Sequence, residues 1–185
     1  MTLPLPSGTW TLDQTHTTVE FTVRHLGISK VRGRFTGFDA TIVIADDPSA
    51  STVHAEIDLS TVDTNNADRD AHLRGSDFFS VDTHPTMRFE STSLTELGDN
   101  RYRLDGTLSL NGRTHPQELT IEFFGTETFP GDGSLHAGFA ATGSLSRKAF
   151  GVDFNVPLGS GGFVIGDQVT IELDVQLLPA TASVR

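Results

Sequence analysis

The sequence contains no cysteine. Disulfide bonds, thiolate metal sites and cysteine nucleophiles are therefore excluded together. Tryptophan and tyrosine occur once each, whereas phenylalanine occurs 13 times. Because a phenylalanine ring has no polar tip, it requires fully apolar surroundings. A chain with this aromatic usage has either a large dry core or an apolar cavity, and composition does not separate the two.

Long apolar runs and positive charge are also scarce. No stretch approaches the length of a transmembrane helix, and residues 1–10 lack the basic patch and apolar run of a signal peptide. We therefore expect a cytoplasmic protein without stable membrane insertion, or a periplasmic or extracellular one if a leader was removed. The formal net charge is -11, and an acidic surface disfavours both nucleic acid and flat adsorption onto anionic membranes.

Apolar and polar residues alternate with a period of two along most of the chain. Val19, Phe21 and Val23 share one parity with His25, and similar rows follow as far as residues 169–177. Such rows predict about eight antiparallel strands, each dry on one face. Several rows are long, which favours a closed barrel over a two-sheet sandwich, although neither is excluded. We expect one domain spanning residues 1–185.

Two stretches break the alternation. Residues 64–75 predict a short helix, with Asn65 or Asn66 as its N-cap and Gly75 as its end. Residues 147–167 are too long for a hairpin turn, and loops of this size are often functional. The helix would bring two pairs of side chains one turn apart, Asp68 with His72 and Asp70 with Arg74.

Motifs for chemistry are missing. The seven histidines show no tight ligand spacing, so no metal is expected. Ser160 lacks the first glycine of a Gly-x-Ser-x-Gly elbow, and no Lys-Ser or Lys-Thr follows Gly159–Gly162 as in a phosphate loop. We therefore expect no catalytic residue, no cofactor and no enzyme. His25 is either a polar group at the barrel mouth or a buried histidine bonded to the backbone.

A family pattern runs through these residues from about Thr9 to Leu178. Its parts include Trp10-Thr-Leu12-Asp13-x-x-His16, then Val31-x-Gly33-x-Phe35-x-x-Phe38, then Arg69-Asp70-x-His72-Leu73-Arg74-x-x-Asp77-Phe78-Phe79, and finally Arg147-x-x-Phe150-Gly151. The chain resembles the YceI-like family, which are lipocalin-like polyisoprenoid-binding proteins.

The resemblance implies an all-β fold, namely an eight-stranded antiparallel lipocalin-like barrel with a short helical cap. It also implies a long internal tunnel for an isoprenoid chain, such as a quinone or a polyprenyl phosphate. The expected function is therefore that of a carrier, store or sensor of a long apolar lipid. Homodimerisation stays open.

Parity and the family pattern together nominate the site residues. Those expected to contact the ligand are Phe21, Val23, His25, Phe35, Phe38, Ile42, Phe89, Leu108, Phe123, Phe139, Phe150 and Ile171. Those expected at the headgroup or cap are His16, Arg69, Asp70 and Arg147.

Two alternative functions are left open, and a gate is expected at one end of the barrel. An enzyme acting on such a lipid would require His16, His25, Asp70 or Arg147 to converge at the mouth, and a solid-core barrel would instead bind a protein partner.

We expect residues 147–167 and the helix to close one barrel end over the ligand. Glycines 159, 161 and 162 would supply the hinge, and residues 154 and 163–165 the apolar cover. Alternatively, both stretches are rigid plugs locked by ion pairs of Arg69, Asp70 and Arg147.

Overall fold

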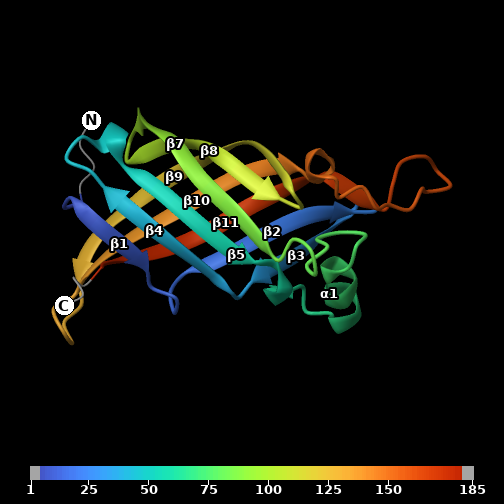
Figure 1. The fold of residues 1–185 in the computed structure, drawn as a ribbon, viewed down its shortest axis with the longest axis horizontal. Coiled ribbons are helices and arrows are strands. Elements are labelled where there is room, and N and C mark those ends of the chain that lie inside the picture. Colours follow the sequence, from blue (N-terminus) through green and yellow to red (C-terminus); the bar gives the residue numbers. More distant parts are fainter. Residues whose placement is uncertain (1–4, 181–185) are drawn as a thin grey trace.

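The computed structural model describes residues 5–180. In this part of the chain, eleven strands form one antiparallel sheet (Figure 1). They are β1 (Gly8–Leu12), β2 (Thr18–His25), β3 (Ser29–Phe35), β4 (Phe38–Ile44), β5 (Thr52–Asp58), β6 (Val62–Asp63), β7 (Thr86–Gly98), β8 (Arg101–Leu110), β9 (Arg113–Thr128), β10 (Leu135–Ser146) and β11 (Ile165–Pro179).

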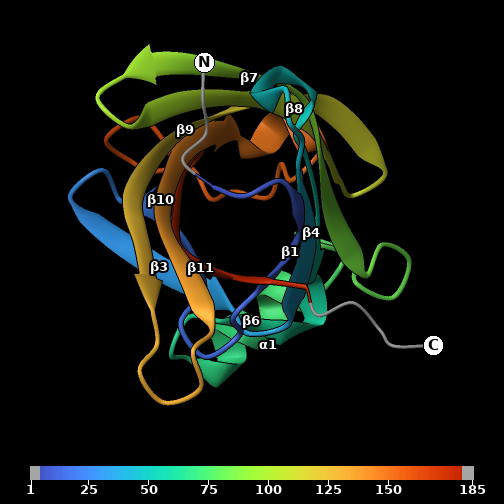
Figure 2. The same ribbon diagram turned by 90° about the vertical axis from the view of Figure 1, so that its left-hand side faces the viewer.

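The sheet closes into a barrel because β1 pairs with both β4 and β11. The eight positions around the ring are occupied in the order β1-β4-β5-β7-β8-β9-β10-β11. Strands β2, β3 and β6 continue the paths of β1, β4 and β5, since β2 pairs with β11 and β3 pairs with both β2 and β6. The predicted eight-stranded antiparallel barrel is confirmed, and Figure 2 shows the ring from one end.

Alternation along each strand places one row of side chains inside the barrel. In β8 the buried positions are Tyr102, Leu104, Gly106, Leu108 and Leu110, and partly exposed residues stand between them. Glycine is required at position 106, because a Cβ there would lie 2.5 Å from the Phe89 ring. The inward rows therefore interlock around large aromatic rings, as a closed barrel needs.

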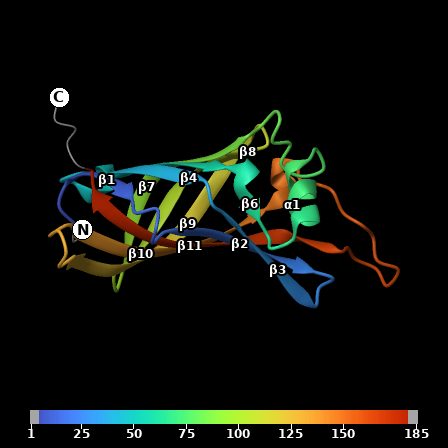
Figure 3. The ribbon, with the colours of Figure 1, turned by 90° about the horizontal axis from the view of Figure 1, so that it is seen from below.

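The barrel has two unlike ends. At the capped end lie the β2–β3 turn, helix α1 (Ala67–Arg74) and residues 147–164, which begin with the 3₁₀ turn η3 (Arg147–Phe150) (Figures 1 and 3). We call the other end the N-terminal end, and its loops are residues 45–51, 99–100 and 129–134, with the 3₁₀ turn η1 (Pro48–Ala50) in the first. A further 3₁₀ turn, η2 (Leu59–Thr61), joins β5 to β6.

The predicted helix is confirmed with slightly shorter bounds. Asn66 is its N-cap, and the Asn66 side chain accepts a hydrogen bond from the Arg69 amide. Both predicted pairs within the helix are wrong, because stronger partners lie outside it. The His72 imidazole pairs with Asp77 at 2.8 Å, and the Arg74 guanidinium donates to the Ser60 carbonyl at 2.7 Å. Within residues 5–180, no helix has the length and apolar character to cross a bilayer.

Candidate functional site: an apolar cavity along the barrel

A cavity of about 500 Å³ runs inside the barrel. Its lining extends from Leu5 and Ile44 at the N-terminal end to Phe154 and Ile165 at the capped end. Ligand sites commonly have volumes of about 300–1,000 Å³, so this cavity has room for a ligand. Most of the lining side chains are aliphatic or aromatic.

Most of the residues nominated from the sequence line this cavity. The structure brings together Phe21, Val23, His25, Phe35, Phe38, Ile42, Phe89, Leu108, Phe139 and Ile171. They come from seven strands, of which β2 contributes three, β4 two, and β3, β7, β8, β10 and β11 one each. His25 is the polar member of this set and lies beside the β2–β3 turn.

Two of the nominated aromatic residues do not line the cavity. Phe123 is buried and faces inward, and its ring packs against the cavity-lining Phe139 at a centroid distance of 5.0 Å. The bulge in the β9–β10 pairing leaves Phe123 directly opposite Phe139. Phe150 is also buried, and its ring contacts the edge of His115 at 5.0 Å, because η3 turns it toward β9. Neither residue belongs to the cavity lining, and their contact with a ligand stays a prediction.

Sequence reasoning missed several lining residues. Tyr102 and Leu104 belong to the same inward row as Leu108, so parity could have found them. Burial raises the pKa of the Tyr102 phenol, and the nearby Glu96 carboxylate raises it further. A further missed group is His72, Phe78 and Phe79, which lie in and after helix α1, where alternation gives no signal.

A buried polar cluster fixes α1 against the barrel. The Asp70 carboxylate accepts hydrogen bonds from the Thr64 amide at 2.8 Å and from the Thr64 hydroxyl. The Arg69 guanidinium donates to the Thr64 hydroxyl at 2.7 Å and to the Thr64 carbonyl at 2.8 Å. Arg69 borders the cavity, whereas Asp70 faces Thr64 and does not line it. Asp70 is therefore a structural residue of the cap.

Arg147 fixes the second capping segment. Its side chain is buried, and its guanidinium donates to the carbonyls of Val152 at 2.6 Å, Gly166 at 2.9 Å and Phe154 at 3.0 Å. Burial lowers the pKa of Arg147, and the carboxylates of Asp167 and Asp153 oppose this effect. The expectation that ion pairs hold the capping segments is wrong, because backbone carbonyls are the main partners of both Arg69 and Arg147.

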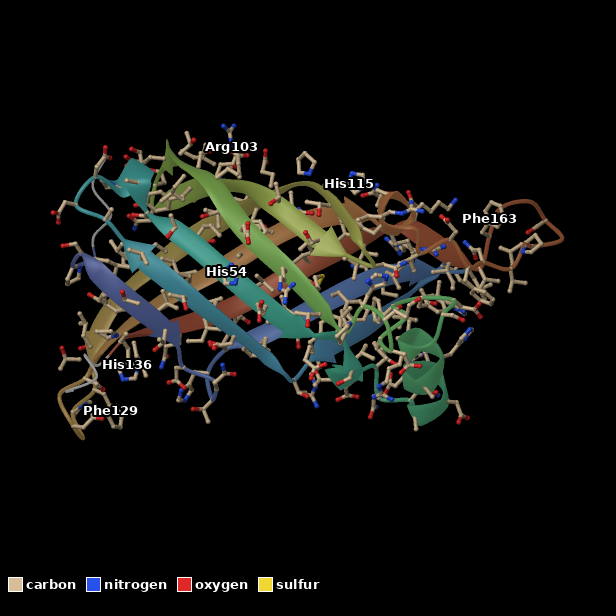
Figure 4. The ribbon with its side chains drawn as sticks, viewed as in Figure 1. His54, Arg103, His115, Phe129, His136 and Phe163 are labelled. Carbon is tan, nitrogen blue, oxygen red and sulfur yellow. The ribbon has the colours of Figure 1, made fainter. Side chains whose placement is uncertain are left out.

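His16 lies away from the cap. Its imidazole pairs with Asp13 at 2.8 Å, and the Gln176 amide donates to the same Asp13 carboxylate at 2.9 Å. Gln176 also reaches His136 at 2.7 Å, and His136 lies at the N-terminal end (Figure 4). The structure therefore places His16 outside the capping segments, and its contact with a ligand headgroup stays a prediction. It belongs to a polar cluster that joins the β1–β2 connection to β11.

The two capping segments meet at an aromatic seam, which consists of His72, Phe78 and Phe154. The His72 ring lies 5.0 Å from Phe78 and 4.9 Å from Phe154, and Phe78 lies 5.4 Å from Phe154. All three residues line the cavity. The seam therefore lines the cavity at its capped end.

The glycine-rich part of the second segment does not cover the cavity. Residues 156–163 form a small hairpin, in which Pro157 pairs with Phe163, and Figure 1 shows it projecting beyond the barrel end. Phe163 is 55% exposed and is absent from the cavity lining. Its expected role as a cover was wrong, whereas Phe154, Val164 and Ile165 do line the cavity.

The polar groups around the cavity are satisfied internally. Among residues 5–180, no buried side-chain nitrogen or oxygen lacks a hydrogen-bond partner. The same residues contain no group of three or more His, Asp or Glu side chains placed to hold a metal ion. His54 is half-exposed on the outer wall between Glu56 and Glu90 (Figure 4). These three side chains do not form a group that could hold a metal ion.

The sequence of this barrel matches the model of the YceI-like domain over residues 10–177. The chain belongs to the YceI-like family. Its curated relatives include a UPF0312 protein of Staphylococcus aureus, 34% identical over 168 residues, or 90% of this chain and 95% of the relative. A UPF0312 protein of Pectobacterium atrosepticum is 37% identical over 171 residues, or 92% of this chain and 82% of the relative.

Solved structures share the architecture of this YceI-like chain. The Campylobacter jejuni YceI protein superposes with a TM-score of 0.71 at 28% identity and covers 92% of this chain and 98% of its own. BcnA of Burkholderia cenocepacia has a TM-score of 0.76 at 18% identity, covering 89% and 98%. A polyisoprenoid-binding domain from Saccharophagus degradans has a TM-score of 0.63 at 14% identity, covering 92% and 98%, which shows a shared fold.

Proposed function

We propose that this YceI-like protein binds one long apolar lipid, an isoprenoid quinone or polyprenyl type, inside the barrel and does no chemistry on it. The observation that carries the proposal is the continuous apolar cavity between the two barrel ends. The polyisoprenoid-binding domain of the same fold supports this class of ligand. Such a protein acts as a carrier, store or sensor of the lipid.

The energetics of an apolar cavity are sufficient for tight binding. Burying a methylene contributes about 0.8 kcal/mol before the costs of association. At roughly 0.3 kcal/mol per heavy atom, a ligand of about 40 carbons reaches nanomolar affinity. Because directional contacts are not needed, the affinity should follow chain length.

An enzymatic role has less support, because the residues it would need are dispersed. His16 belongs to the cluster with Asp13 and Gln176, and Asp70 is occupied by Thr64. Arg147 has its donors on backbone carbonyls. Of the four candidates, His25 and Arg147 line the cavity, and neither has a partner arranged as a general base or nucleophile requires.

We propose that the ligand passes through the aromatic seam. A closed barrel wall has no edge, so a ligand must pass through an end. At the seam, His72 and Phe78 come from the helical segment and Phe154 comes from the second one, so separating the two segments opens the cavity. The headgroup of a bound lipid would then lie at the capped end, where His25 borders the cavity.

Native mass spectrometry of the purified protein, combined with lipid extraction, tests the proposal. We expect a mass increment that disappears on denaturation and corresponds to an extractable lipid, or uptake of an added polyprenyl phosphate or quinone by delipidated protein. A protein that carries no lipid and takes up neither compound would contradict the proposal and favour a barrel with a protein partner.

A further inference from the structure

The capped end carries exposed apolar side chains that neither the cavity nor the core uses. Leu26 and Ile28 lie on the β2–β3 turn and are 39% and 82% exposed, and Val156 and Phe163 on the projecting hairpin are 49% and 55% exposed. The two segments are neighbours, because the Leu26 amide donates to the Val164 carbonyl at 2.7 Å. We call Leu26, Ile28, Val156 and Phe163 the apolar rim, and Figure 4 shows Phe163 at the capped end of the barrel.

The local conformation of Leu26 is unfavourable for its residue type. Leu26 and Gly27 are the central residues of a turn, and both have positive φ, 54° and 73°. The corresponding first position is occupied by Asp99 in the turn 99–100 and by Asn111 in the turn 111–112. Aspartate and asparagine are the residue types, besides glycine, that left-handed backbone favours. Folding alone would thus select a polar residue at position 26. The exposed leucine therefore indicates a function outside the fold.

Positive charge accompanies the apolar rim in an otherwise acidic chain. Arg24 and Lys30 are directly opposite each other in the β2–β3 pairing, and such a like-charged pair is destabilising. Within the described residues, no carboxylate forms an ion pair with either of them. The Lys148 ammonium lies 5.4 Å from the Phe163 ring centre. An anionic partner would relieve this repulsion.

Apart from Asp153, the acidic groups near the capped end are already bonded or belong to the helical segment. Asp167 accepts hydrogen bonds from the Ser146 hydroxyl at 2.7 Å and from the Lys148 amide at 3.1 Å. The acidic residues of the helical segment, such as Asp68 and Asp82, lie on the side of α1. Figure 3 shows α1 and the β2–β3 hairpin on opposite sides of this end. Asp153 is the exposed carboxylate within the second segment.

We propose that the apolar rim docks on an anionic lipid bilayer. Leu26, Ile28 and Phe163 enter the headgroup region, and Arg24, Lys30 and Lys148 contact lipid phosphates, a combination that gives reversible interfacial binding. The exposed carboxylates at the N-terminal end, including Asp46, Asp47 and Asp132, are repelled by the same surface. Docking is therefore oriented, with the capped end of the cavity toward the lipid.

Flotation of delipidated protein with vesicles tests the inference. We expect binding to vesicles of phosphatidylcholine mixed with phosphatidylglycerol, weaker binding at high salt, and little binding to phosphatidylcholine alone. The double variant Ile28→Asp/Phe163→Asp should bind at least about tenfold more weakly. The matched control, Leu97→Asp/Phe129→Asp, changes side chains that are 51% and 55% exposed at the N-terminal end, and it should bind as the wild type does.

Three results would overturn the inference: no binding to anionic vesicles at low salt, equal binding to both vesicle types, or equal losses in the two double variants. A dimer in solution that Ile28→Asp/Phe163→Asp dissociates would also overturn it, because a second copy would then cover the rim. Neither variant touches the cavity lining, so uptake of a soluble polyprenyl probe should be unchanged. Since docking is measured without cargo, its failure is distinguishable from a failure of lipid binding.

Discussion

The two ends of the barrel are stabilised in different ways. At the N-terminal end, short polar turns satisfy themselves, since the Asp47 carboxylate accepts from the Ser49 amide at 3.0 Å and Asp132 accepts from the Ser134 amide at 2.9 Å. At the capped end, buried Asp70 and Arg147 hold long segments through contacts distant from any turn motif. Local turn rules thus suffice for the N-terminal end, whereas the capped end, through which we propose that the ligand enters, departs from them.

The largest expected effect comes from removing the buried cation of the capped end. Arg147→Met leaves the carbonyls of Val152, Phe154 and Gly166 without their donor, and each buried unsatisfied group costs about 1–3 kcal/mol. We expect a loss of about 3 kcal/mol or more in the free energy of unfolding, measured with urea.

Arg103→Met is the matched control for this comparison. Arg103 is a half-exposed cation on the outer wall, where it pairs with Asp105 at 3.1 Å (Figure 4). Exposed pairs contribute only about 0–1 kcal/mol, so the control should lose little stability. Equal losses in the two variants would contradict the role assigned to Arg147.

Exchange kinetics separate the seam from the glycine hairpin. Phe154→Ala removes the ring that contacts His72 and Phe78, so a fluorescent polyprenyl probe should enter and leave several-fold faster. Gly161 lies in the projecting hairpin, where a Cβ would have no neighbour within 4 Å. Because its φ is positive, Gly161→Ala strains the backbone, but only at the tip of the hairpin. Stopped-flow exchange should be unchanged in this variant. The opposite ranking would restore the glycine hinge as the gate.

Reciprocal changes at two turns sharpen the comparison of the ends. Leu26→Asn places a residue that tolerates positive φ at the capped end, and we expect about 1 kcal/mol of added stability. Asp99→Leu makes the reverse change at the N-terminal end and should cost about as much. Thermal and urea unfolding provide the measurement. If both substitutions change the free energy of unfolding in the same direction, the leucine at position 26 does not lower the stability of the fold.

The smallest expected effect is a pH dependence at Asp13. Hydrogen bonds from Thr15, and then His16, hold the pKa of this carboxylate well below its usual range. A depressed pKa stabilises the fold above the unfolded-state value of about 3.9, and this stability is lost as pH falls toward the folded-state pKa. Asp13→Asn should therefore be less stable than wild type at pH 7, and the difference should shrink in urea titrations below about pH 4. A constant difference would contradict this assignment.

The wall of the barrel was predictable because its pattern is local. Inward rows such as Phe21 with Val23, or Leu104 with Leu108, follow directly from alternation, and β8 shows that alternation without interruption. Phe123 shows the limit of this reasoning, since parity correctly placed it inside but gave no sign that it packs in the core cluster with Trp10 and Ala137 and not in the cavity lining.

The cap was predictable in position but not in contacts. Breaks in alternation located both segments, and turn chemistry located Asn66 and Gly75 as the helix caps. Which side chains cover the cavity depends on hydrogen bonds between segments distant in the sequence, such as those from Arg147 to Gly166 and from Arg74 to Ser60. No spacing rule contains that information. The sequence therefore indicated Phe154 as part of the apolar cover, but not its contacts with His72 and Phe78.

The most direct test of the lipid-binding account is a titration with isoprenoid chains of increasing length. Ala141 lines the cavity midway along β10, whereas its neighbour Thr142 points outward. We therefore compare delipidated wild type with Ala141→Phe, which obstructs the cavity, and with Thr142→Phe, which adds the same ring outside. The account predicts that affinity rises with chain length in the wild type and in Thr142→Phe, by up to about 0.8 kcal/mol per added carbon, and stops rising early in Ala141→Phe. Affinity that is independent of chain length, or equal in all three proteins, would contradict it.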